Sequence, residues 1–307
     1  MTRGQRDGLL LTLATAGISG VSIFLNSYGV RVVHDAAVYT TGKNAVSALV
    51  LVALVLAWSR RGRPTLTRPV GGRQWAGLAA IAVVGGSLPF VLFFDGLARE
   101  SSTQAALLQK TLVVWVSLLA VPLLRERLGA LQVAAVALLM IGQLMASGSG
   151  SGLFSMPFGR GEAEILAATL LWAVEVVLAK RLLGSLSSWT VGLARMVAGS
   201  ALLVGWLLIR PGGGLTAVSA AGWGWMLLTG CLLAAYVATW FAALARAQAV
   251  DVTAVLVVGA PVTALLSAAV QHAPLRPQLA GLLLIIVGAA LVVARMTRRS
   301  DAQLTPA

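Results

Sequence analysis

The chain has 307 residues, of which 58% are hydrophobic and only 11% are charged. This composition is too apolar for a water-soluble domain and is typical of a protein that crosses a membrane many times. The formal net charge of +13 does not indicate a nucleic-acid partner, because the basic residues are dispersed between apolar segments and are not gathered on one face.

Ten apolar segments are predicted to cross the bilayer as helices, because each approaches the roughly 20 residues that a helix needs to span the hydrocarbon. The segments of the first half are residues 9–30, 37–58, 75–95, 103–124 and 128–146. Those of the second half are residues 162–182, 189–209, 222–244, 252–271 and 278–294. The predicted fold class is an all-α polytopic membrane protein with an uncleaved first span and no soluble domain.

The two halves of the chain resemble each other. The segment GLARESSTQAALL at 96–108 aligns with ALARAQAVDVTAVL at 243–256 through a shared Leu-Ala-Arg. Five spans per half is an odd number, so the second copy must enter the membrane from the opposite side, as in the inverted repeats of many secondary transporters. The predicted domains are a first five-helix repeat at 1–147, a linker loop at 148–161, a second five-helix repeat at 162–296 and a cytoplasmic tail at 297–307.

The distribution of basic residues predicts the orientation of the chain. Of the 23 lysines and arginines, 15 fall in the loops on the side of both termini, five in the loops of the other side and three inside spans. Because cytoplasmic loops carry the excess of positive charge, both termini are expected to be cytoplasmic. The expected location is the cytoplasmic (inner) membrane, with membrane lipids around a multi-pass chain.

Several short motifs accompany the ten-span pattern. They are Leu171-Trp172-Ala173, the Arg125-Glu126-Arg127 that precedes Leu128, and Pro261-Val262 with Leu265-Leu266-Ser267. On these residues the sequence resembles the drug/metabolite transporter superfamily, in particular the EamA family, along nearly its whole length. The resemblance implies a ten-helix inverted-repeat carrier with a central cavity, usually an exporter of small metabolites or drugs. The chain departs from the family near Lys110–Leu112, where the family often has proline, and at residues 272–276, where it often has an acidic residue.

Two lysines fall inside predicted spans. At 1.5 Å per residue, Lys43 and Lys110 both lie roughly 10 Å below the outer end of their spans. Ammonium groups at that depth without counter-charges should either lose a proton or attract an anion, so we expect them to line a cavity for an anionic group of the substrate. The residues expected to help them bind substrate are Gln109, Thr111, Asn44, Tyr39, Trp115 and Trp172.

Alternatives stay open for these residues. Either lysine can instead snorkel to the interface on its long stem. The deep tryptophans Trp115 and Trp172 can pack between helices instead of stacking on a substrate.

One carboxylate and one guanidinium share a depth in the inner half of the predicted bundle, Glu175 and Arg195. Opposite charges at one level are expected to pair, which avoids two separate desolvation penalties. The alternative is that Glu175 is the carboxylate that couples transport to protons, with Arg195 biasing its titration. The proton is therefore the coupling ion considered for this chain.

The sequence gives no support to the other functional classes. It contains no catalytic triad, no paired catalytic carboxylates, no phosphate-binding glycine loop and no metal-ligand cluster, and its one cysteine is Cys231. No catalytic residue, metal or cofactor is therefore expected, and a channel is disfavoured because no filter repeat is visible. The predicted function is a secondary active transporter that exports small anionic or zwitterionic metabolites, such as amino acids or organic acids, by alternating access. The alternatives are a drug efflux carrier or a lipid-intermediate flippase of the same superfamily.

Overall fold

A computed structural model describes residues 3–62, 65–126, 128–146, 159–210, 218–273, 275 and 279–302. Within these ranges the regular structure is entirely helical. The helices of the first half are α1 (Arg3–Val33), α2 (Ala36–Arg60), α3 (Gly72–Val84), α4 (Leu88–Arg99), α5 (Ser102–Lys110), α6 (Leu112–Leu124) and α7 (Ala130–Ala146). Those of the second half are α8 (Arg160–Leu182), α9 (Ser188–Ile209), α10 (Ala220–Arg246), α11 (Ala249–Leu256), α12 (Gly259–Gln271) and α13 (Leu279–Ala302).

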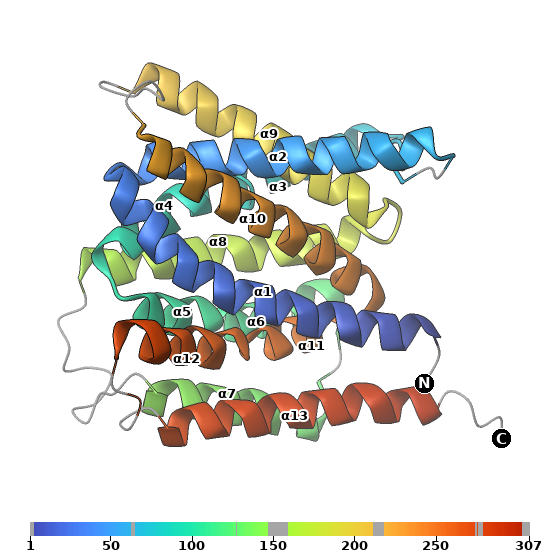
Figure 1. The fold of residues 1–307 in the computed structure, drawn as a ribbon. Helices are drawn as coiled ribbons and strands as arrows, with labels where there is room; N and C mark the ends of the chain where they lie inside the picture. Colours follow the sequence, from blue (N-terminus) through green and yellow to red (C-terminus); the bar gives the residue numbers. More distant parts are fainter. Residues whose placement is uncertain are drawn as a thin grey trace.

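Three of the crossings are broken helices. The pairs α3/α4, α5/α6 and α11/α12 each continue one apolar segment, at Gly72–Arg99, Ser102–Leu124 and Ala249–Gln271. Counting each pair as one crossing, the described helices cross the molecule ten times, which confirms the predicted ten-helix fold (Figure 1). Eight crossings are long and apolar enough to span a membrane by length and composition, whereas α7 has a shorter apolar stretch and α8 carries more charged residues.

The ends of the helices differ from the predicted spans. The first helix begins at Arg3 and the last ends at Ala302, so both extend past the apolar segments, and residues 297–302 of the expected tail continue α13. A helix continues as long as its backbone hydrogen bonds do, even where the side chains become polar. Span limits drawn from hydropathy therefore leave out the polar ends of the helices. Most of the expected linker, residues 148–158, lies outside the described residues, and α8 begins directly after it.

The two halves run in opposite directions. In Figure 1, α1 begins on the side of the molecule where α13 ends, which we call the termini side, and α8 begins on the opposite side. The helix starts also agree with the aligned segments, because the N-cap residues Ser101 of α5 and Gln248 of α11 are 147 residues apart. The same offset relates Thr111, between α5 and α6, to Val258, the N-cap of α12.

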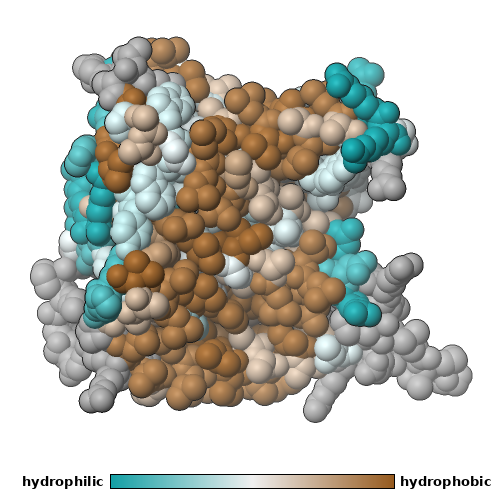
Figure 2. All heavy atoms as spheres, in the orientation of Figure 1, coloured by the Kyte–Doolittle hydropathy of each residue, from teal (hydrophilic) through white to brown (hydrophobic). Residues whose placement is uncertain are grey.

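The surface fits a lipid environment. Figure 2 shows apolar side chains over the middle of the molecule, with hydrophilic residues gathered at its two ends. Large apolar side chains such as Leu49 of α2 and Leu208 of α9 are exposed, at 69% and 76%. Water would penalise so much exposed apolar surface, whereas lipid does not. The chain is therefore a multi-pass membrane protein.

Glycine allows two elements to touch at the centre of the bundle. A Cβ on Gly199 of α9 would lie 2.6 Å from the carbonyl atoms of Gly86, which stands between α3 and α4. A Cβ on Gly86 would in turn clash with the carbonyl oxygen of Arg195. The backbone break between α3 and α4 is thus pressed directly onto α9, a contact that only glycine permits.

We expect Gly199→Ala to destabilise the protein by about 1–3 kcal/mol, because the new methyl group must push two backbones apart. The measurement is thermal unfolding of the purified protein in detergent, followed by tryptophan fluorescence. Gly205→Ala is the matched control on the same helix, since its Cβ would meet nothing within 4 Å. Equal melting temperatures for the two variants would contradict this close contact.

Candidate functional site

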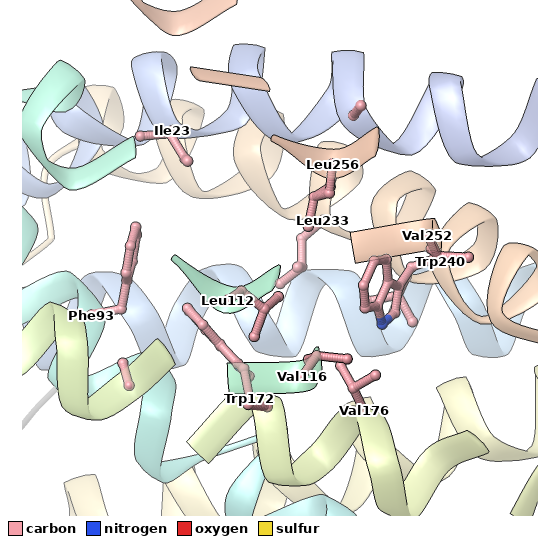
Figure 3. Close-up of a cluster of buried hydrophobic side chains, with 14 of the residues drawn as sticks. Ile23, Phe93, Leu112, Val116, Trp172, Val176, Leu233, Trp240, Val252 and Leu256 are labelled. Atoms are coloured by element: carbon pink, nitrogen blue, oxygen red, sulfur yellow. The ribbon is translucent and has the colours of Figure 1, made fainter. Parts of the chain in front are cut away.

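A cavity lies at the centre of the bundle, between helices of both halves. Its polar lining residues are Ser19, Ser22, Asn26, Lys43, Gln109, Glu175, Arg195, Thr229 and Tyr236. Its apolar lining residues are Ile23, Phe90, Phe93, Phe94, Leu112, Trp172, Val176, Leu233 and Trp240. Figure 3 shows part of the apolar lining, with Phe93 and Trp172 on one side and Leu233 and Trp240 on the other. The cavity therefore combines charged groups with a largely aromatic wall, the mixture that small-molecule sites use.

Lys43 lies in the first half of α2 and reaches the cavity. Its side chain is 2% exposed, its Nζ donates a hydrogen bond to Asn26 Oδ1 at 3.0 Å, and it lies 4.0 Å from the centroid of the Phe94 ring. The Tyr39 hydroxyl holds the same Asn26 oxygen at 2.6 Å and lies 2.9 Å from Thr229 Oγ1. No carboxylate of the described residues forms an ion pair with Lys43, so its charge is available to a ligand.

Glu175 of α8 and Arg195 of α9 form a buried ion pair. Glu175 Oε1 lies 2.5 Å from Arg195 Nε, and Arg195 Nη2 donates to Glu175 Oε2 at 3.2 Å. Both side chains are less than 5% exposed. Two contacts between a guanidinium and a carboxylate fix their relative orientation as well as their charge. The expected pairing is present.

The ion pair and Lys43 belong to one cavity, although their depths in the sequence placed them at separate levels. The Phe90 ring of α4 lies between the two cations, with its centroid 5.7 Å from Lys43 Nζ and 5.2 Å from Arg195 Cζ. Gly85 leaves space for the Glu175 carboxylate, because a Cβ at residue 85 would clash with it. Its free carbonyl accepts a hydrogen bond from Trp172 Nε1 at 3.2 Å. The break between α3 and α4 is thus part of the site.

Lys110 lies behind the cavity lining. It is the last residue of α5, is 1% exposed, and its Nζ donates to Ser19 Oγ and to Gln109 Oε1, both at 2.6 Å. Ser19 and Gln109 line the cavity, whereas Lys110 does not. The two lysines that the sequence placed at one depth therefore have different relations to the cavity: Lys43 faces it, and Lys110 contacts it through two oxygen acceptors.

The remaining predicted residues divide in the same way. Gln109 and Trp172 line the cavity, whereas Tyr39, Asn44, Thr111 and Trp115 do not. Thr111 Oγ1 donates to the carbonyl of Leu108 and accepts a bond from Trp115 Nε1 at 3.3 Å, so this pair stabilises the break after α5. The Asn44 amide is buried and has no hydrogen-bond partner within the described ranges.

Several lining residues were missed from the sequence. Asn26 and Ser19 are polar residues within the first span, a signal that could have been used, because polar side chains in a span usually face the bundle interior. The aromatic run of Phe90, Phe93 and Phe94 gives no such signal, since aromatic residues face lipid as readily as a cavity. Among the described residues no group of three or more His, Cys, Asp or Glu is placed to hold a metal ion.

Comparison with known proteins gives a family and a fold. The model of the EamA-like transporter family matches the chain twice, at residues 6–148 and 159–294. No curated protein sequence matches. One crystal structure of a protein superimposes with a TM-score of 0.75 over 95% of this chain and 98% of its own, at 18% sequence identity. An identity that low shows a shared fold and says nothing of the ligand.

Removing one member of the ion pair should cost more stability than removing both. Glu175→Gln leaves Arg195 charged, buried and uncompensated, and we expect a loss of about 3–5 kcal/mol. The double variant with Arg195→Gln buries no charge and should recover part of that loss. Thermal unfolding of the purified variants in detergent measures both effects. Losses that simply add would mean that the two side chains do not stabilise each other.

Proposed function

The chain belongs to the EamA-like transporter family, and we propose that it is a secondary active transporter that exports small anionic or zwitterionic metabolites, such as amino acids or organic acids. The observation that carries the proposal is the Lys43 ammonium, which faces the central cavity and has no ion-pair partner among the described residues. An unpaired charge inside a span costs about 2.5–3.5 kcal/mol, and a bound carboxylate offsets that cost.

The charge of the cavity supports an anionic or zwitterionic substrate. The charged lining residues are Lys43, Arg195 and Glu175, and the last two neutralise each other. One positive charge therefore faces the ligand. A lipophilic cation would meet repulsion there, which disfavours a multidrug pump for such compounds.

The aromatic wall supports a substrate that also has an apolar part. Phe93, Trp172 and Trp240 (Figure 3) are buried and line the same cavity as Lys43. Such a wall gains free energy from apolar surface and from ring contacts, whereas a small inorganic anion uses neither. Direct contacts are proposed for Lys43, Gln109 and Trp172. The other predicted residues, Lys110, Tyr39, Asn44, Thr111 and Trp115, are proposed to act from behind the lining.

The proposed cycle is alternating access of two inverted repeats in the cytoplasmic membrane, with a proton as the coupling ion. The opposite course of the two halves supports the rocking of one against the other around a fixed site. The excess of lysine and arginine on the termini side supports cytoplasmic termini. Export is the usual direction implied by the family resemblance.

Counterflow into proteoliposomes tests the substrate class. Vesicles are loaded with a mixture of unlabelled amino acids and organic acids, and the uptake of each labelled member is measured. We expect wild-type counterflow by at least one member and a decrease of tenfold or more, about 1.4 kcal/mol of binding, with Lys43→Gln. Lys180→Gln is the control, because that lysine hydrogen-bonds the carbonyls of Leu244 and Ala247 and does not line the cavity.

The outcome also separates the alternative carriers. Counterflow that is equal in wild type and Lys43→Gln would remove Lys43 from the substrate site. If no amino acid or organic acid exchanges, the same assay with lipid phosphates tests a flippase.

The orientation has its own test. Fusions of green fluorescent protein to the C-terminus are expected to fluoresce, and fusions of alkaline phosphatase at the same point are expected to be inactive, because the first folds in the cytoplasm and the second requires export. The matched fusion point is residue 159, before α8, where the two reporters should give the reverse result. Active phosphatase at the C-terminus would overturn the proposed orientation.

A further inference from the structure

Lys110 is a buried cation that the proposed substrate contacts do not use. Its ammonium is held by two neutral oxygens, Ser19 Oγ and Gln109 Oε1, each at 2.6 Å. Its Cε lies 3.0 Å from the position of a Cβ on Gly259, so it packs against the start of α12 with no room to reach lipid. Snorkelling is therefore ruled out for this side chain, and its charge is confined to the bundle.

No carboxylate neutralises Lys110. Within the described part of the chain it forms no ion pair. The elements packed against α5 are α1, α4, α8 and α12. In α12 no residue is charged, and α4 carries charge only at its end, away from Lys110. The charged residues of α1 lie at its two ends, and the mid-helix charge of α8 is Glu175, which is bound to Arg195. A buried ammonium without a counter-charge raises the free energy of the protein, and loss of its proton removes that cost.

The fold does not need a cation at this point. The offset of 147 residues between the halves places Val257 of the second repeat where the first has Lys110. The corresponding break between α11 and α12 forms around that apolar side chain. Because the same backbone feature exists without a lysine, the charge of Lys110 requires a reason other than the helix break.

Ser19 and Gln109, whose side-chain oxygens hold Lys110, also line the cavity. A zwitterion that places its carboxylate on Lys43 has an ammonium group that needs acceptors, and Ser19 Oγ and Gln109 Oε1 are acceptors of the required kind. Each of these oxygens has two lone pairs and can accept from both ammonium groups, as Asn26 Oδ1 accepts from Tyr39 and Lys43. Two ammonium groups held on the same oxygens would lie within two hydrogen-bond lengths of each other, and like charges at that separation repel.

We propose that Lys110 carries the proton that this transporter exchanges for a zwitterionic substrate, because the positive charges of Lys110 and of the substrate ammonium repel each other at Ser19 and Gln109. When substrate binds, one N–H bond of Lys110 breaks and its proton passes to Ser19 Oγ, while that hydroxyl gives its own proton to water in the cavity and the Lys110 nitrogen keeps its lone pair. When substrate leaves, the lone pair takes a proton again. This inference rests on the proposed function and narrows its substrates to compounds that carry both a carboxylate and an ammonium.

Glu175 is the other buried group considered for coupling, and its geometry argues against it. Both of its oxygens are engaged by Arg195, at 2.5 and 3.2 Å, and protonation would leave that guanidinium buried without a counter-charge. Lys110 has no such partner to lose. The carboxylate is thus a fixed charge, and the lysine is the exchangeable one.

Proton release is the direct test. Purified protein in weakly buffered detergent receives a mixture of apolar L-amino acids or, separately, the matching mixture of 2-hydroxy acids, in which a hydroxyl replaces the ammonium. Wild type is expected to release up to one proton per chain with the amino acids and markedly less with the hydroxy acids. Release that is equal for the two mixtures, or that persists in Lys110→Met, would overturn the proposal.

The sign of two substitutions separates charge repulsion from a structural role. Lys110→Met removes the positive charge beside Ser19 and Gln109, so counterflow of amino acids at equal pH should be retained, whereas accumulation driven by a pH difference at clamped membrane potential should be lost. In wild type, a one-to-one exchange sustains about a tenfold substrate gradient for each pH unit. Lys110→Arg keeps a permanent charge on the oxygens and should impair counterflow. Better function of the arginine variant than of the methionine variant would favour a structural role and contradict this one.

Two controls keep the answers distinct. Val257→Ala alters the matching position of the second repeat and should leave the proton release and the driven accumulation in place. The chain has three lysines, Lys43, Lys110 and Lys180, so NMR of the lysine side chains with selective labelling follows Lys110 before and after the amino acids are added. A Lys110 signal that stays in the ammonium form when the amino acids saturate the protein would overturn the inference. Absence of counterflow in wild type would instead overturn the proposed function.

Discussion

The centre of this protein depends on the ion pair between Glu175 and Arg195. Either charge alone inside the membrane would cost several kcal/mol of desolvation free energy. The pairing offsets that cost only while α8 and α9, which carry the two side chains, keep them in contact. The backbone is broken beside the pair: α3 ends at Val84, Gly86 touches α9, and α4 begins at Leu88. The break leaves the Gly85 carbonyl to Trp172. One electrostatic contact thus determines a helix break, a glycine contact and the position of an aromatic lining residue.

The sequence predicted much of this arrangement. Hydropathy located the ten crossings, and the depth of Glu175 and Arg195 along their helices predicted their pairing, because depth follows directly from residue count. Rotation about the helix axis does not follow from it. Lys43 and Lys110 share a depth, yet Lys43 faces the cavity and Lys110 lies behind Gln109. Which way a side chain faces depends on the rotation of its helix about its own axis, and residue count does not give that rotation. The break after Lys110 was also unpredicted, because the apolar pattern continues through it.

The two halves share a backbone plan and differ in chemistry. Their fourth crossings break at matching residues, but Lys110 stands against Val257, so the cation is an addition to the common plan. The third crossings differ in the backbone itself: α3/α4 is broken, whereas α10 runs unbroken from Ala220 to Arg246. The broken crossing is the one that lies against the ion pair, because Gly85 faces the Glu175 carboxylate. Identical halves would give a site with symmetry, whereas a substrate with a carboxylate at one end and an ammonium at the other needs a site without it.

The two lysines illustrate how the same side chain is given different tasks by its acceptors. Lys43 is bound to an oxygen of Asn26 that Tyr39 also holds, and Tyr39 is in turn placed by Thr229, so several helices fix this ammonium in position. The faces of Phe94 and Phe90 add further stabilisation of its charge. Lys110 donates to Ser19 and Gln109, and both of these residues line the cavity. Lys43 thus faces the cavity itself and is held by a network of three helices, whereas Lys110 is held behind the lining by two neutral oxygens, and the different tasks proposed for the two lysines follow from that difference.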